Sequence, residues 1–257
     1  MSSTILSTHD LSRHFGGVAA LNLVSLDIAD KQVHSIIGPN GAGKTTLINV
    51  ITGLLEASAG KVVYQDKDIT DRPIHDRVKL GLCRTFQITS IFMGLSVHEN
   101  IRIAKQAQAG GSLRVFSSRQ SLNEVNRATE EIIRRVGLED VAEVPAKNLA
   151  HGDQRVLEVA IALASNPKLV LLDEPAAGMS PTETDQVSEL IRSLGEEMAV
   201  VLVEHDMEVV MSISDRVTVL HQGGIIADGS PEEISEDEQV KAAYLGTEEN
   251  WAPLIDL

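Results

Sequence analysis

The residues from Gly38 to Thr45 have the types and spacing that bind phosphate. They read GPNGAGKT and fit the pattern G-x-x-x-x-G-K-[ST] without departure. Glycines let successive backbone N–H groups point at phosphate oxygens, Lys44 faces the β- and γ-phosphates, and the Thr45 hydroxyl suits Mg²⁺. This phosphate-binding loop therefore predicts a site for a nucleoside triphosphate. Its predicted binding residues are Gly38, Pro39, Asn40, Gly41, Ala42, Gly43, Lys44, Thr45 and Thr46.

Two neighbouring carboxylates could supply the metal and water chemistry of such a site. Asp173 and Glu174 follow the apolar run Leu169–Leu172 and precede Pro175. A carboxylate at the tip of a strand can hold Mg²⁺ through water, and the next side chain points to the opposite side of the strand. We therefore predict Asp173 as a metal residue beside Thr45, and Glu174 as the group that orients or deprotonates a hydrolytic water.

Alternating strands and helices must position these residues. Val33–Ile37 predicts a buried strand before the loop, and Thr45–Gly53 predicts a helix after it. Further strands are predicted at Val18–Ile28, Lys61–Gln65, Leu82–Phe86, Leu169–Leu172 and Ala199–Val203, with a hairpin of Arg216–Leu220 and Gly224–Ala227. Helices are predicted at Val97–Ala109, Leu122–Val136, Asp153–Ala164 and Met207–Ile213, and after the capping sequences that start at Ser180 and Ser230. The order predicts an α/β sheet protein with a helical block inserted between its halves.

Composition limits the class of protein. The chain has 257 residues, of which 43% are hydrophobic and 23% charged, as in an ordinary globular protein. Its single cysteine excludes a disulfide framework and a cysteine-based zinc site. The net charge of −15 argues against free binding to nucleic acid or to an anionic lipid surface. Without an export signal or an apolar run long enough to span a membrane, we expect a soluble, intracellular protein.

Several further motifs, in the same order, resemble those of ABC-type ATPases. The segment Leu149, Ala150, His151, Gly152, Asp153 resembles their signature loop, which is usually L-S-G-G-Q. Gln87 resembles the glutamine at the entry to their helical block, and His205 resembles their switch histidine. Phe15 lies 23 residues before Gly38, where that family stacks an aromatic ring on adenine, although packing in the core is an alternative for this residue.

The resemblance implies a P-loop ATPase core of the ABC type, with an antiparallel β-subdomain and an inserted α-helical subdomain at about residues 88–165. The ATPase domain would span residues 1–249, and residues 250–257 would be a C-terminal extension. ATP and Mg²⁺ would be the cofactors. Lys44, Glu174 and His205 would be catalytic, and Gln87 would join Thr45 and Asp173 at the metal. Phe15, Gln87 and the signature loop residues would contact nucleotide.

The signature loop departs from the usual pattern. Ala150 replaces the serine whose hydroxyl reaches a γ-phosphate, and His151 replaces a glycine. Ser180 stands where many members carry an aspartate. Backbone N–H groups near Gly152 could still bind a phosphate, because a helix is predicted to start at Asp153.

Finer motifs resemble the longer, LivG-type ATP-binding subunit of branched-chain amino acid importers. They are Phe15–Leu21, Arg84–Gln87, Glu174–Met179 and Val203–Met207. The expected partners are a second, different ABC ATPase subunit, two transmembrane permease subunits and, indirectly, a solute-binding protein, with no nucleic acid. The expected place is the cytoplasmic face of the plasma (inner) membrane, as a peripheral subunit.

Other functions stay open at this point. The ATPase subunits of urea or short-amide importers and of lipopolysaccharide export are close alternatives. A soluble ABC ATPase of translation or DNA repair usually carries two cassettes or a long coiled coil, and this chain has neither. A P-loop kinase would have no reason to carry the signature loop or His205.

Overall fold

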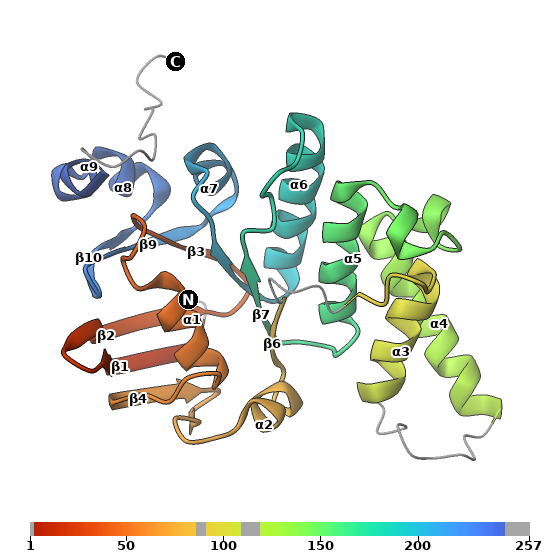
Figure 1. Ribbon diagram of the computed structural model, residues 1–257, viewed down its shortest axis with the longest axis horizontal. Coiled ribbons are helices and arrows are strands. Elements are labelled where there is room, and N and C mark those ends of the chain that lie inside the picture. Colours follow the sequence, from red (N-terminus) through yellow and green to blue (C-terminus); the bar gives the residue numbers. More distant parts are fainter. Residues whose placement is uncertain (1–2, 86–90, 109–118, 245–257) are drawn as a thin grey trace.

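A six-stranded sheet lies at the centre of the computed structural model, which describes residues 3–85, 91–108 and 119–244 (Figure 1). The strand order is β10-β9-β3-β8-β7-β6, and only β10 runs antiparallel to its neighbour. The strands are β3 (Val33–Ile37), β6 (Leu82–Arg84), β7 (Leu169–Asp173), β8 (Ala199–Val203), β9 (Arg216–His221) and β10 (Gly224–Gly229). Every residue of β3, β7 and β8 is buried, which explains the apolar runs Leu169–Leu172 in β7 and Ala199–Val203 in β8. In β3 the buried residues include the polar His34 and Ser35.

The two faces of this sheet pack against different helices. Val170 and Leu172 of β7 join a core formed with α5 (His151–Leu163) and α6 (Pro181–Glu197). Leu169 and Leu171, which alternate with them, join a second core that includes the buried face of α1 (Lys44–Thr52). The central strands are therefore held from both sides, and their carboxyl ends are fixed in place.

A second sheet of four strands packs beside α1 (Figure 1). Its order is β2-β1-β4-β5, and all of its pairs are antiparallel. The strands are β1 (Thr4–Phe15), β2 (Val18–Ala29), β4 (Ala59–Tyr64) and β5 (Lys67–Asp68). The sequence patterns predicted β2 and β4 but missed the twelve-residue strand β1.

The helical block consists of α3 (Val97–Gln108), α4 (Arg119–Val136) and α5, which pack on one another beyond the β6 edge of the large sheet (Figure 1). Helix α5 starts at His151, two residues before the predicted start. The predicted subdomain limits of about 88–165 remain a prediction, as do the domain limits 1–249, and residues 250–257 lie outside the described residues.

The remaining helices lie before, between and after strands of the large sheet. They are α2 (Ile74–Lys79), α7 (Met207–Ile213), α8 (Pro231–Glu236) and α9 (Glu238–Tyr244). Both predicted capping boxes are confirmed: Ser180 with Glu183 opens α6, and Ser230 with Glu233 opens α8. Helix α2 was not predicted. Within the described ranges, no helix is long and apolar enough to cross a membrane. The predicted α/β architecture, with its antiparallel sheet and helical block, is confirmed.

Candidate nucleotide-binding site

The phosphate-binding loop joins β3 to α1, and two of its glycines lie against neighbouring backbone. Gly43 has φ of 108°, and a Cβ there would lie 2.5 Å from the carbonyl oxygen of Ala20 in β2. Gly38 has φ of 146°, and a Cβ there would lie 2.0 Å from the carbonyl oxygen of Leu220 in β9. Because no side chain fits at either position, both sheets hold the loop close and fix its shape.

Lys44 begins α1 and lies across the loop. Its Nζ donates hydrogen bonds to the carbonyl oxygens of Gly38 and Pro39, the latter at 3.3 Å. These contacts hold a positive charge beside the backbone N–H groups that start the helix. The arrangement suits an anion, because the helix N-terminus carries a partial positive charge and the Lys44 ammonium carries a full one.

A cavity of about 420 Å³ collects most of the predicted site residues. It is lined by Ala20, Asn40, Gly41, Ala42, Gly43, Lys44, Thr45, Thr46, Asp173, Glu174, Val203 and His205. Parallel pairing of β7 with β8 brings Asp173 opposite Val203, so the residues that follow both strands meet at one edge of the sheet. Ala20 and Val203 were not predicted as site residues; each contributes through its position on a strand that adjoins the loop.

Glu174 and His205, which follow β7 and β8, face each other in the lining of this cavity. His205 Nδ1 lies 3.8 Å from Glu174 Oε1, and both side chains are partly exposed. Glu174 has φ of 48°, and its backbone N–H donates to the Val203 carbonyl oxygen at 2.8 Å. This left-handed conformation, uncommon for a non-glycine residue, places the carboxylate beyond the end of β7 and next to the imidazole.

Glu204 fixes the spacing of these two residues, and the sequence analysis missed it. Its side chain is buried, with 1% exposed. One carboxylate oxygen accepts from the backbone N–H of Ala176 at 3.0 Å, and the other accepts from that of His205 at 3.1 Å. Burial raises the pKa of Glu204, while these backbone N–H groups oppose the shift. The carboxylate thus ties the segment after β7 to the segment after β8.

Asp173 is paired inside the protein. Its Oδ2 lies 2.6 Å from Nη2 of Arg84, and both side chains are almost fully buried. No three His, Cys, Asp or Glu side chains of the described residues lie close enough together to hold a metal by themselves. One carboxylate and the Thr45 hydroxyl are nevertheless a donor set that fits Mg²⁺, because Mg²⁺ usually takes one or two protein oxygens and completes its shell with phosphates and water.

Phe15 does not belong to the core. It ends β1 with 46% of its surface exposed, and the Arg13 guanidinium carbon lies 4.7 Å from its ring centroid. The ring does not line the 420 Å³ cavity. The structure therefore contradicts the core-packing alternative and leaves an exposed ring, with a cation on it, that suits stacking.

We expect Phe15→Ala to weaken adenine nucleotide binding by about 1–3 kcal/mol, the magnitude for stacking a base on an aromatic side chain. Isothermal titration with ATP would measure the loss, and Val18→Ala, which truncates another exposed apolar residue of the same hairpin, is the matched control. Unchanged affinity together with a lower melting temperature would contradict the stacking role.

The signature loop lies away from this cavity. None of Leu149, Ala150, His151, Gly152 and Asp153 lines it. The backbone N–H of Gly152 donates to Oε1 of Glu183 at 3.2 Å, and burial together with Glu183 raises the pKa of Asp153. His151, Gly152 and Asp153 therefore form the first turn of α5, which starts before the predicted Asp153, at a place separate from the cavity that Lys44 lines. Gln87 lies outside the described residues.

Comparison with known proteins identifies the family of the chain. Residues 21–177 match the family model described as ABC transporter. The chain belongs to the ABC transporter family. Residues 225–250 of this ABC protein also match a model described as branched-chain amino acid ATP-binding cassette transporter.

Similar proteins cover nearly the whole chain. The high-affinity branched-chain amino acid transport ATP-binding protein LivG of Salmonella typhimurium is 39% identical over 96% of this chain and 99% of its own length. BraF of Pseudomonas aeruginosa, with the same description, is 40% identical over 96% and 99%. The lipopolysaccharide export system ATP-binding protein LptB of Haemophilus influenzae is 32% identical over 95% and 98%.

Solved structures agree with the fold of this ABC protein. The ADP conformation of MJ1267, an ATP-binding cassette of an ABC transporter, superposes with a TM-score of 0.85 at 30% identity, covering 95% of this chain and 100% of that one. A nucleotide-free ATP-binding cassette from an ABC transporter gives 0.83 at 30% identity, with the same coverage. The predicted ABC-type fold class is confirmed.

Proposed function

We propose that this ABC protein hydrolyses ATP with Mg²⁺ and powers the uptake of branched-chain or related amino acids through separate membrane subunits. The observation that carries the proposal is the single cavity shared by Lys44, Asp173, Glu174 and His205. The names of LivG and BraF support the choice of solute class. LptB, at lower identity, supports lipopolysaccharide export as the second candidate.

The loop residues would bind the triphosphate. Backbone N–H groups of residues 38–46 and the α1 N-terminus neutralise phosphate oxygens, and Lys44 exchanges its loop carbonyls for the β- and γ-phosphates. Bound Mg²⁺ would supply positive charge that offsets the negative charge developing during phosphoryl transfer. Thr45 and Asp173 would hold it, with Gln87 as a further ligand that lies outside the described residues.

Glu174 would then act on the hydrolytic water. Its carboxylate is partly exposed and lines the cavity, so it can accept a proton from a water placed in line with the γ-phosphate. His205, 3.8 Å away, would keep that carboxylate in place and donate to the γ-phosphate. Glu204 supports both, because it binds the backbone of each segment.

A second ATPase subunit would complete the site. In the arrangement that the ABC resemblance implies, each ATP would lie between the phosphate-binding loop of one subunit and the signature loop of the other. The separation of α5 from the 420 Å³ cavity within this chain is consistent with that scheme. Because Ala150 lacks the signature hydroxyl, a different subunit with an ordinary serine would serve the site built on Lys44 and Glu174 better than a second copy would.

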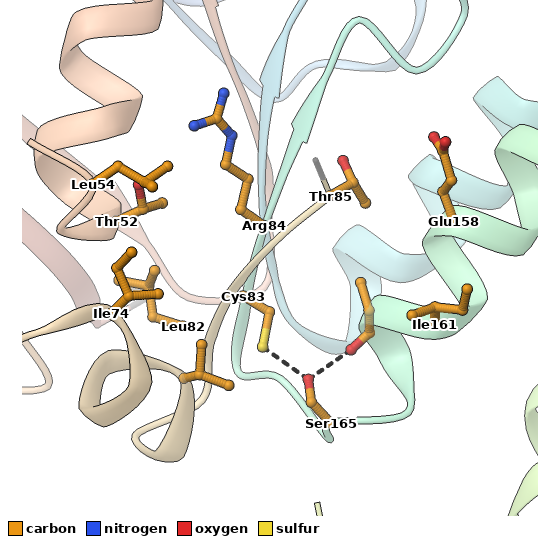
Figure 2. A pocket seen from close by; sticks show the side chains of 12 residues that line it. Thr52, Leu54, Ile74, Leu82, Cys83, Arg84, Thr85, Glu158, Ile161 and Ser165 are labelled. Atoms are coloured by element: carbon orange, nitrogen blue, oxygen red, sulfur yellow. Dashed lines mark hydrogen bonds between the residues drawn. The ribbon is translucent and has the colours of Figure 1, made fainter. Parts of the chain in front are cut away.

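A groove beside β6 offers a place for a permease segment. It has a volume of about 200 Å³ and lies between α5 and the α1–α2 side of the fold (Figure 2). Its lining is largely apolar and includes Leu54, Ile74, Val78, Leu82, Ile161 and Ala162. A peripheral place on the cytoplasmic face of the membrane would bring this groove to the permease subunits.

Reconstitution tests the proposal. We expect the purified chain alone to hydrolyse ATP at least about 100-fold more slowly than the complex with a second ATPase subunit and two permeases, because misplaced reacting groups cost about that factor. Vesicles that carry the complex and its solute-binding protein should accumulate leucine, isoleucine or valine when ATP is supplied on the side of this chain.

Two results would count against the proposal. Uptake of urea or transfer of lipopolysaccharide, with no amino acid uptake, would favour an alternative solute. A full hydrolysis rate from two copies of this chain alone would contradict the need for a different partner while leaving the ATPase assignment in place.

A further inference from the structure

The guanidinium of Arg84 joins three elements around the candidate metal site. Nη2 lies 2.6 Å from Oδ2 of Asp173 on β7, and Nη1 lies 2.5 Å from the side-chain oxygen of Asn49 on α1. The Arg84 side chain is 7% exposed and that of Asp173 is 4% exposed. One planar group therefore connects the helix after the phosphate-binding loop to the strand that carries the predicted metal carboxylate.

Strand pairing explains why Arg84 reaches this position. It is the last residue of β6, which pairs with β7 so that Arg84 lies opposite Leu171, two residues before Asp173. Figure 2 shows Arg84 and Cys83 leaving β6 in opposite directions, with Cys83 toward Ser165 in the groove. The alternation of side chains on a strand thus sends Arg84 toward α1 and the end of β7.

The contact has two physical consequences for Asp173. A buried carboxylate without a partner is costly, and the ion pair with the Arg84 guanidinium offsets that cost for Asp173. The bond to Oδ2 also fixes the plane of the carboxylate and leaves Oδ1 for a metal or its water. Lysine could supply the charge, but it lacks the planar fork that holds Asp173 and Asn49 together.

We propose that Arg84 is a positioning residue for the metal ion: it orients the Asp173 carboxylate toward the nucleotide-bound metal. The inference rests on the proposed function, which places the metal at Asp173. Partners that orient metal ligands typically contribute 10–100-fold to metal affinity. Arg84 should therefore act on metal affinity and leave metal-free nucleotide binding nearly unchanged, which a merely structural ion pair would not do.

Manganese titration of the full chain with saturating ATP, followed by electron paramagnetic resonance, tests the proposal. We expect Arg84→Lys to weaken Mn²⁺ binding about 10–100-fold, and Arg84→Met to weaken it at least as much. ATP affinity measured in EDTA should stay within about twofold of wild type, as a positioning role for the metal alone requires. If Arg84→Met does not fold, Arg84→Lys carries the test.

Arg216→Lys is the matched control. Arg216 forms a two-bonded pair with Asp228 on the β9–β10 edge of the same sheet, far along the strand order from β6. The control should leave both Mn²⁺ and ATP affinities unchanged.

Three outcomes would overturn the inference. Mn²⁺ affinity within about threefold of wild type in both Arg84 variants, well below the effect of an orienting partner, would remove the orienting role. Higher affinity in Arg84→Met would mean that the positive charge repels the metal. An equal loss of ATP affinity in EDTA would make the pair structural. Asp173→Asn distinguishes a failure of this inference from a failure of the proposed function. If this variant also leaves Mn²⁺ binding unchanged, the proposed metal site itself is wrong.

Discussion

Replacement of Glu174 by glutamine should leave ATP binding intact and lower turnover by a factor of about 10²–10⁴, the usual contribution of a general base. The amide has nearly the same shape but cannot accept a proton from water. The left-handed backbone of Glu174 and its contact with the Val203 carbonyl do not involve the carboxylate, so the variant should fold normally. With hydrolysis blocked, the two ATPase subunits should stay closed around ATP.

The measurement is phosphate release by the complete complex, together with ATP titration of the chain alone. Glu196→Gln, on the exposed side of α6, makes the same chemical change away from the cavity and should retain the full rate. Equal turnover in Glu174→Gln and wild type would remove Glu174 from catalysis. The matching substitution in a partner subunit should do less harm, because the partner's site would be completed by the Ala150 loop of this chain.

Replacement of Lys44 by alanine should weaken ATP binding by about 100-fold or more. Hydrogen bonds to charged groups contribute about 1.5–3 kcal/mol each, and every 1.4 kcal/mol is a factor of ten in affinity. The effect should be smaller for AMP, because AMP lacks the β- and γ-phosphates that the ammonium would face. Titration with ATP, ADP and AMP would show this gradation.

The contacts of Lys44 within the loop add a second measurement to the Lys44 experiment. Lys44 also bonds the Gly38 and Pro39 carbonyls, so its removal changes the unliganded loop as well as the complex. Urea unfolding of the same variant separates the two effects. Lys61→Ala is the matched control. Lys61 is an exposed residue of β4, so its replacement removes one positive charge away from the cavity and should leave ATP affinity unchanged. Near-normal ATP affinity in Lys44→Ala would contradict the assignment of the phosphate-binding loop.

The sequence predicted those elements whose burial is uniform or whose ends have a local signal. β7 and β8 are buried along their whole length, and Leu169–Leu172 and Ala199–Val203 appear in the sequence as unbroken apolar runs. β3 is buried as well, and it was predicted although His34 and Ser35 interrupt its apolar residues. The starts of α6 and α8 depend on contacts between residues three apart, which are visible in the sequence itself.

The missed elements lack such signals. β1 contains buried polar residues, and its pairing with β2 shifts register several times. Its sequence therefore shows no regular alternation of apolar and polar residues. Thr8, for example, is a polar residue whose burial is tolerated because its hydroxyl donates to the Val24 carbonyl at 3.0 Å. Helix α2 has only six residues and is held by Arg77, whose guanidinium donates to the carbonyls of Val50 and Ile51 at the end of α1.

The site was predicted where it follows a local motif and missed where it depends on folding. Lys44, Thr45, Asp173, Glu174 and His205 each sit in or beside a recognisable run, and all of them line the cavity. Arg84 and Glu204 act through partners 89 and 28 residues away in the chain. Only the pairing of β6, β7 and β8 brings these partners together, and no local pattern records that pairing.

The fixed shape of the phosphate-binding loop has a consequence for the rate of nucleotide exchange. Gly38 and Gly43 lie against backbone of both sheets, and Lys44 donates hydrogen bonds to the Gly38 and Pro39 carbonyls of the same loop. Little conformational entropy is then left to lose on binding, because the residues that would surround the phosphates are already ordered. We therefore expect association to be limited by encounter rather than by ordering of the loop, and we expect differences in affinity between nucleotides to lie mainly in their dissociation rates.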